Sequence, residues 1–301
     1  MWYRRKAGWG FDIKCKSTSL RQWVVAIVAA GCWSLQAHPL TAQDPATATD
    51  KPPTDSASND TKTLADPDAQ RVLSLLKEAP PHLLRLMDRG KVRWSFDDLP
   101  LKEAGKQGLT KFQYEVGHRA QFRYRWLASS GSQYRLAASI AYQKLSFEMK
   151  HEIILSEFFS ARGAWKSRLL LHEFDHVCIS TDPRVAAIAE DLFFGRERLE
   201  VVVDAKGYQQ QIQQEIEKQI LEKFEGRKAA FGKMLQAAYD RLDALSLHGL
   251  QPIEDRKKLF TELFSRDFLE AIDGFPIDRI DNKSLEFSEA VEMHYRPFLL
   301  P

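Results

Sequence analysis

Residues 169–177 combine an apolar helical pattern with two histidines four positions apart, in the order His-Glu-x-x-His. Positions four apart lie on one face of an α-helix, so His172 and His176 can offer two imidazole nitrogens to one metal ion. Glu173 follows the first histidine, where a carboxylate can take a proton from water beside that ion. Zinc suits this set best, because imidazole ligands and an open coordination position are typical of hydrolytic zinc sites.

Chance is the alternative explanation of this spacing, since a core helix can carry two histidines and a glutamate without any function. Histidine is scarce in the chain, with 8 in 301 residues, so chance matches are uncommon. The sequence therefore predicts a zinc ion held by His172 and His176, with Glu173 as the catalytic residue.

Composition allows one full-sized domain with additional segments. Hydrophobic residues make up 44% of the chain and charged residues 28%, which is typical of a soluble globular protein with enough apolar material for a core. Charge is uneven, because residues 1–42 carry six Lys or Arg against the single Asp12, leaving 37 basic and 40 acidic residues elsewhere. That balance gives no sign of a nucleic-acid-binding surface, so we expect no nucleic-acid partner.

Residues 1–42 are typical of a secretory signal peptide. A cationic start precedes the apolar run 23–35, and small residues follow at cleavage points ending in Ala37 and Ala42. The apolar run is short for a membrane span. An alternative is a bacterial lipoprotein signal ending at Cys32, which would attach the protein to a membrane through its N-terminal segment. We therefore expect a secreted, periplasmic or cell-envelope protein, with an uncleaved N-terminal anchor as the remaining variant.

Residues 43–70 are predicted to form a disordered linker. They are rich in Asp, Thr, Pro, Ala and Ser and have almost no large apolar side chains, so they cannot bury enough surface to offset the cost of ordering. The folded domain is expected to span residues 71–301. Its only cysteine is Cys178, so this domain cannot form an intramolecular disulfide, and Cys178 is interpreted as a small buried apolar residue.

A strand-rich segment precedes the histidine motif. Apolar and polar residues alternate over 92–96, 119–126, 134–142 and 145–149, which predicts an antiparallel sheet of about four strands. The alternation slips by one residue near positions 143–144, which predicts a bulge. Arginines gather on one face of the second strand, and a solvated surface is a simpler interpretation than a substrate-binding one. His151 and Glu152 are expected on the protein surface.

Helical patterns dominate the sequence after the motif. Pro183 ends the motif helix, and Asp182 is expected to cap the next helix, which continues through Phe193. A long helix is predicted over 208–245, followed by a final helix over 255–272. The fold class is therefore α+β, with an antiparallel sheet, then the motif helix, then a mainly helical C-terminal half.

Two histidines leave the site incomplete, because catalytic zinc takes a third protein ligand. Asp182 stands six residues after the second histidine, as in metzincins, but Ile179 occupies the place of their turning glycine. Glu190 and Glu197 would imitate the helix-borne glutamate of gluzincins at unusual separations. His248 is the remaining candidate and has the commonest metal-binding side chain.

The chain resembles bacterial secreted zinc-dependent proteases of the zincin type over roughly residues 110–250. The resemblance depends on two short motifs: His172, Glu173 and His176 in the first, and Tyr239-Asp240 with His248-Gly249 in the second. Three additional residues separate the two parts of the second motif in this chain. The resemblance implies a zincin-like fold, favours His248 as the third zinc ligand, and implies a peptide or protein substrate.

The predicted function is that of a secreted zinc metallopeptidase, in which Glu173 acts as general base and returns its proton to the leaving amine. Tyr239 would stabilise the oxyanion if the long helix covers the cleft, and Asp175 is expected to be solvent-exposed. The alternative is a non-catalytic zincin-like module with a binding or structural role in the cell envelope. A carboxylate at position 173 is needed for hydrolysis but not for that alternative.

Overall fold

The computed structural model describes residues 66–130, 133–204 and 209–299. The predicted signal peptide, with its variant lipid attachment at Cys32, lies outside the described residues, as does most of the predicted linker. Helix α1 (Pro67–Glu78) begins inside that predicted linker, because Pro67 occupies the first helical position and the Asp66 side chain caps the amide of Asp68. No described helix has the length and apolar character needed to cross a membrane.

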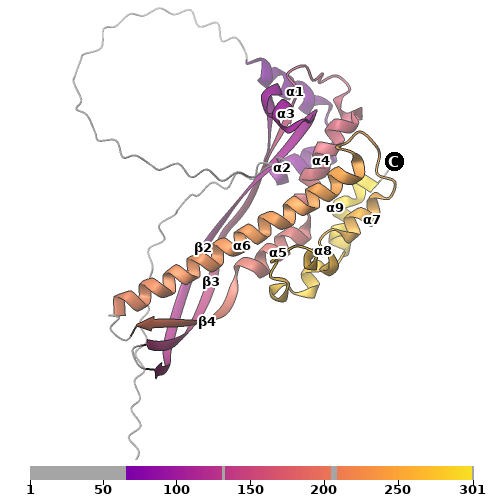
Figure 1. Ribbon diagram of the computed structural model, residues 1–301. Helices are drawn as coiled ribbons and strands as arrows, with labels where there is room; N and C mark the ends of the chain where they lie inside the picture. Colours follow the sequence, from indigo (N-terminus) through magenta and orange to yellow (C-terminus); the bar gives the residue numbers. More distant parts are fainter. Residues whose placement is uncertain (1–65, 131–132, 205–208, 300–301) are drawn as a thin grey trace, which may run out of the picture.

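The chain forms a mixed α+β structure in which a long, mostly antiparallel sheet packs against helices (Figure 1). The sheet contains β1 (Val92–Phe96), β2 (Gly108–Ser130), β3 (Gln133–Leu155) and β4 (Gly195–Asp204). Strand β3 pairs with all three others, in the order β1-β3-β2 with β4 joined to β3 farther along. Two expectations are corrected: β1 runs parallel to β3, and the fourth strand is β4, because residues 134–142 and 145–149 belong to one continuous strand.

A bulge divides the β2–β3 hairpin where the sequence pattern slips. Gly117 pairs with Ser146 and His118 pairs with Lys144, which leaves Leu145 as the additional residue. An inserted residue exchanges the two faces of a strand, so the slip in hydrophobic alternation and the bulge have the same cause. The predicted bulge is confirmed.

Helices α4 (Arg168–Ser180), α5 (Pro183–Phe193) and α6 (Gln209–Ser246) form the helical layer next to the sheet. Asp182 caps α5 through the amide of Arg184, as expected. The long helix α6 matches the predicted long helix closely and runs beside the β2–β3 hairpin for most of its length (Figure 1). Its apolar stripe therefore covers one face of the sheet from end to end.

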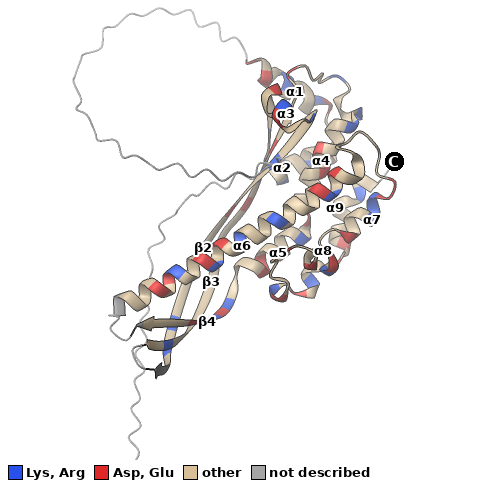
Figure 2. Cartoon of the chain, in the orientation of Figure 1, with Lys and Arg blue, Asp and Glu red and all other residues tan. Residues whose placement is uncertain are grey.

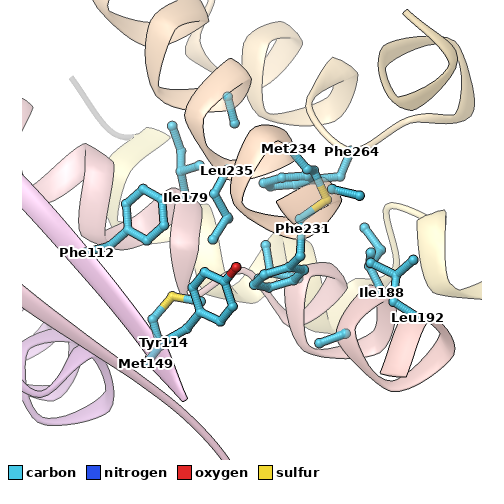
Figure 3. Packing of buried hydrophobic residues seen from close by; sticks show 14 of the residues in the cluster. Phe112, Tyr114, Met149, Ile179, Ile188, Leu192, Phe231, Met234, Leu235 and Phe264 are labelled. Carbon is cyan, nitrogen blue, oxygen red and sulfur yellow. The ribbon is translucent and has the colours of Figure 1, made fainter. Parts of the chain in front are cut away.

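Large side chains from the sheet and from α6 interdigitate in the core. Figure 3 shows Tyr114 and Met149 from the hairpin close to Phe231 and Leu235 of α6. The rings of Tyr114 and Phe231 meet edge to face with 5.0 Å between their centroids. Burial of this stripe fixes the position of α6 along the sheet, and with it the place where its C-terminal end meets α4.

The C-terminal region is more divided than the sequence pattern predicts. Instead of one helix over 255–272, the chain forms α7 (Arg256–Glu262) and α8 (Arg266–Glu270), separated where Phe264 takes a left-handed conformation with φ of 62°. Helix α9 (Glu289–Leu299) was not predicted, and short η1 (Ala164–Lys166), η2 (Ile277–Arg279) and η3 (Asn282–Leu285) turns complete the structure. Short α3 (Asp98–Ala104) and α2 (Pro81–Gly90) lie near the start of the sheet.

Candidate metal centre

Helix α4 presents both motif histidines to the interior. His172 and His176 are 5% and 4% exposed. Every residue of α4 after Leu171 is buried, so the helix has no separate polar face. Their rings lie edge to face with centroids 4.7 Å apart, as expected for positions one helical turn apart. Two buried imidazoles of this kind need partners, because burying a polar group without a hydrogen bond or a ligand is costly.

Asp243, near the end of α6, supplies that partner. Its Oδ1 lies 3.0 Å from Nε2 of His172 and 3.0 Å from Nε2 of His176. Among the residues that the structure describes, these three side chains form the group of potential metal ligands, with all donor atoms within 4.8 Å of one another. The expected third ligand, His248, is not a member of that described group, and sequence reasoning did not consider Asp243.

Two imidazoles and one carboxylate fit zinc well. A zinc ion with bonds of 2.0–2.2 Å in tetrahedral geometry separates neighbouring ligand atoms by about 3.3 Å, so only a slight expansion of the observed 3.0 Å contacts is needed. Nδ1 of His176 is buried without a hydrogen-bond partner in the described part of the chain, whereas its Nε2 faces Asp243. The Nε2 atoms are therefore the nitrogens directed at the candidate zinc position.

The second oxygen of Asp243 is held by two further cationic or basic groups. Nζ of Lys106 lies 2.8 Å from Oδ2, and Nδ1 of His248 lies 3.1 Å from the same oxygen. Burial alone would raise the pKa of Asp243, but hydrogen bonds from His172 and His176 and from Lys106 lower it, so the carboxylate stays ionised. His248 therefore reaches the centre through Asp243, with 57% of its side chain exposed.

Glu173 lies in the same pocket, next to the first residues of β2. Thr110 donates its hydroxyl to Oε2 of Glu173 at 2.7 Å, and a Cβ atom at Gly108 would come within 2.7 Å of Oε1. A glycine at position 108 therefore makes room for the carboxylate. Burial raises the pKa of Glu173 to about 7, although His172 and Thr110 oppose the rise.

The His-Gly pair at 248–249 has a structural explanation at this site. Leu247, His248 and Gly249 all have positive φ, and this turn brings Gly249 against α4. A Cβ atom at position 249 would lie 2.8 Å from Cβ of His172, so no larger residue fits without displacement. The amide of Gly249 donates to Oγ of Ser246, which lies 3.3 Å from Nδ1 of His172. This turn therefore orients the first histidine.

A buried chain of hydrogen bonds lies behind the second histidine and holds Tyr239, whose ring packs against it. The Tyr239 hydroxyl donates to Oγ of Ser180, and Ser180 and the Gly90 carbonyl contact the two ring nitrogens of His151. The ring of Tyr239 packs against that of His176 with centroids 4.3 Å apart. His151, expected on the surface, is only 2% exposed because the edge of α4 covers it. The hydroxyl of Tyr239 is thus engaged in the core, although the ring lines the pocket.

The alternative third ligands serve other purposes. Asp182 forms a buried ion pair with Arg184 and accepts a hydrogen bond from Tyr295. Glu190 pairs with Lys144 on the surface. Glu197 forms ion pairs with Lys223, Arg227 and Arg279. Each carboxylate is therefore committed away from the two motif histidines.

Asp175 is also corrected, since it was expected to be exposed and is 2% exposed. It forms an ion pair with the partly buried Arg256 of α7 and so links the motif helix to the C-terminal region. Cys178 is fully buried, as expected, and burial raises the pKa of its thiol well above the usual value. Neither residue lines the pocket.

The pocket is the meeting point of three segments that are distant in sequence. Its lining combines the start of β2, helix α4, the end of α6 and the turn after it. The lining residues are Lys106, Gly108, Leu109, Thr110, His172, Glu173, His176, Tyr239, Asp243 and His248. The sequence does contain a signal for Asp243, which is an acidic residue on an apolar stripe. Asp243 lies four residues after Tyr239 on the buried stripe of α6, where an acidic residue is unexpected.

Comparison of the chain with protein-family models, with curated proteins and with solved structures found no match.

Proposed function

We propose that the protein is a zinc-dependent peptidase with a zincin-like arrangement, in which His172, His176 and Asp243 hold the metal. The observation that carries the proposal is the convergence of these three side chains and Glu173 in one buried pocket. Two neutral imidazoles and a carboxylate leave one coordination position open, which is the arrangement of catalytic rather than structural zinc. When bound, zinc supplies a Lewis acid that polarises a carbonyl group and favours the ionisation of water.

Glu173 is the general base in this proposal. Because Thr110 occupies Oε2, the atom that takes the proton is Oε1, which faces the space left by Gly108. The same carboxyl group then passes the proton to the nitrogen of the leaving amine. Lys106 and His248 hold Oδ2 of Asp243, so that only Oδ1 is directed at the metal position.

An extended peptide is the substrate class that the surroundings favour. Strand β2 is an edge strand of the described sheet, since it pairs with β3 alone, and its first residues line the pocket. Extended peptides add to edge strands through backbone hydrogen bonds. A peptide alongside Gly108–Thr110 would present its backbone carbonyls next to Glu173. Secretion, or location in the cell envelope, remains part of the same proposal.

One observation favours the non-catalytic alternative. The Lys106 ammonium group balances the charge of Asp243 at 2.8 Å, so the site is electrostatically satisfied to a considerable degree without a divalent ion. In that case the pocket would be a structural polar cluster in a binding module. The two functions differ in what they require of Glu173.

The test is the Glu173→Gln variant, which keeps the size of the side chain but removes the base. Zinc content is measured on the purified full-length protein, and cleavage is measured with an unfolded protein such as casein and with a peptide library. We expect the variant to retain zinc and to lose cleavage activity by about 10²–10⁴-fold. Wild-type protein that holds no zinc, or that cleaves nothing in either assay, would contradict the proposal.

A further inference from the structure

One face of the sheet carries exposed arginines on three neighbouring strands, far from the metal centre. This part of the molecule, the arm, consists of residues 118–130, 133–144 and β4 with the first half of α6, and it extends away from the other helices (Figure 1). The pairing register places Arg123 beside Ser139, and Ser139 beside Arg198. We call the exposed residues on this side the arginine face. Its charged members are Arg119, Arg123, Arg125, Arg135, Arg196, Arg198 and Glu200.

The opposite face of the arm has a more even balance of acidic and basic residues than the arginine face. There Glu197 pairs with Lys223 and Arg227 of α6, so cations are matched by an acid under the helix. The arginine face has six exposed arginines and one exposed glutamate, Glu200, which pairs with Arg135, and the register of β4 adds one further acidic position, Asp204. Basic positions on the arm strands are blue in Figure 2. Such a concentration of like charge is unfavourable for the sheet, and an anionic partner would relieve it.

The shape of the arginine face suits a flat array of phosphate groups. The central strand contributes the small residues Ala137, Ser139 and Ala141, so no bulky side chain separates the outer strands. Positions two apart on a strand are about 7 Å apart, and strands are about 4.8 Å apart, so the arginines spread in two dimensions. Every cation in the array is an arginine, and its planar guanidinium group binds two phosphate oxygens at once.

Large apolar side chains are exposed at the end of the same arm. Trp126 is 53% exposed, Leu127 is 42% exposed, and Val202 is 51% exposed beside Arg135. Val202 lies on the arginine face, whereas Trp126 pairs with the buried Leu136 and therefore lies on the opposite face. A linear polyanion would contact a single row of arginines, whereas a planar bilayer surface would contact the arginines of all three strands.

We propose that the arginine face binds the phosphate headgroups of an anionic phospholipid bilayer. The proposal is independent of the metal centre, which lies at the other end of the molecule. Binding of this kind depends on the charge of the lipid and weakens as salt is added, because separated charges are screened within about 10 Å in 0.1 M salt.

The test compares full-length proteins by sedimentation with lipid vesicles. One variant carries Arg119→Gln, Arg125→Gln and Arg198→Gln, and its control carries Lys77→Gln, Lys258→Gln and Lys283→Gln, which remove the same charge from exposed positions elsewhere. Vesicles contain phosphatidylcholine alone or phosphatidylcholine with phosphatidylglycerol. All proteins share residues 1–65, so binding through that segment is common to them, and only differences between the proteins report on the arginine face.

We expect the wild-type protein and the lysine control to partition onto the anionic vesicles, and the triple arginine variant to partition roughly a hundredfold more weakly. The single variant Arg125→Gln, at an exposed position, should partition about fivefold more weakly than the wild-type protein. It replaces the triple variant in the test if that variant does not fold. Equal partitioning of the wild-type protein and either arginine variant would overturn the proposal. Retention on immobilised heparin without any vesicle binding would also overturn it, and would identify a soluble polyanion as the partner.

Discussion

The two ends of the molecule handle polar side chains in opposite ways. At the metal-centre end, His172, Asp243 and Glu173 are almost fully buried, and each is fixed by at least one named partner. On the arm, Arg125 and Arg198 are exposed, and the strands beneath them are held by the apolar stripe of α6 instead. Substitutions at the first end should therefore change folding and metal binding, whereas substitutions on the arginine face should change neither. The predictions below test that contrast.

The largest effect of a substitution should be on the stabilisation of the protein by zinc. A ligand that binds only the folded state at about 1,000 times its Kd raises the unfolding free energy by about 4 kcal/mol. We expect Asp243→Ala to abolish this increment, measured by denaturant titration with zinc and with EDTA. Asp240→Ala is the matched control, since Asp240 is exposed on the same helix and should keep the whole increment. An unchanged increment in Asp243→Ala would show that the carboxylate is not a ligand.

His248→Ala should have a smaller effect on zinc than Asp243→Ala. Its imidazole contacts Oδ2 of Asp243 rather than the metal position, and groups of this kind change metal affinity by about 10–100-fold. A competition titration with a zinc chelator measures the change. Complete loss of zinc from His248→Ala would restore His248 as the third ligand and remove Asp243 from that role.

The buried imidazole of His151 should make the metal-centre end sensitive to acid. Burial lowers the pKa of His151 from 6.5 to about 4 in the folded protein. The unfolded chain therefore takes up the proton first, so this contribution to stability is complete above pH 6.5 and is lost as the pH falls toward 4, by roughly 3 kcal/mol in total. We expect His151→Gln to show a correspondingly weaker loss of stability over that range with EDTA present. Parallel curves for the two proteins would contradict the assignment.

Gly249→Ala should destabilise the protein by about 2 kcal/mol, since it combines a left-handed φ of 80° with a contact of 2.8 Å to Cβ of His172. Gly195→Ala, at the start of β4, is the matched substitution on the arm. Gly195 also has a positive φ, but no atom lies within 4 Å of the added Cβ, so about 1 kcal/mol is expected. The melting temperatures of the Gly249→Ala and Gly195→Ala variants measure this difference. Equal effects would mean that contact with His172 is unimportant.

Exposed arm residues should have the smallest effect on stability. Arg125→Gln is expected to change the unfolding free energy by less than about 0.5 kcal/mol, because Arg125 is exposed and the covered face below it is unchanged. Denaturant titration without lipid measures this. A loss above about 1 kcal/mol would show that the arginines support the sheet itself.

Local sequence patterns were sufficient for most of the elements. The motif helix, the capping of α5 by Asp182, the long helix α6 and the bulge at Leu145 all follow from periodicity and propensity within a few residues. The parallel pairing of β1 and the division of the last predicted helix at Phe264 depend on contacts between distant segments, which periodicity does not report. For the same reason the alternation on β2 identified the arginine face but not what covers its other side.

The candidate site was predictable only where its residues are neighbours in the chain. His172, Glu173 and His176 were found because one helical turn brings them together. Asp243 was missed because its approach to α4 is set by how α6 packs along the whole sheet, and the predicted ligand His248 contacts its second oxygen at 3.1 Å. Burial of His151 and Asp175 was missed because charged and polar residues are usually exposed unless a partner is present.

The position of the metal is best tested by crystals of the zinc-loaded full-length protein, with an anomalous difference map collected at the zinc absorption edge. We expect one strong peak, with the metal at about 2.0–2.2 Å from Nε2 of His172, Nε2 of His176 and Oδ1 of Asp243, and with Lys106 and His248 still on Oδ2. A peak bonded to His248 and separate from Asp243, or no peak at the two motif histidines, would show that the proposed zinc centre is wrong.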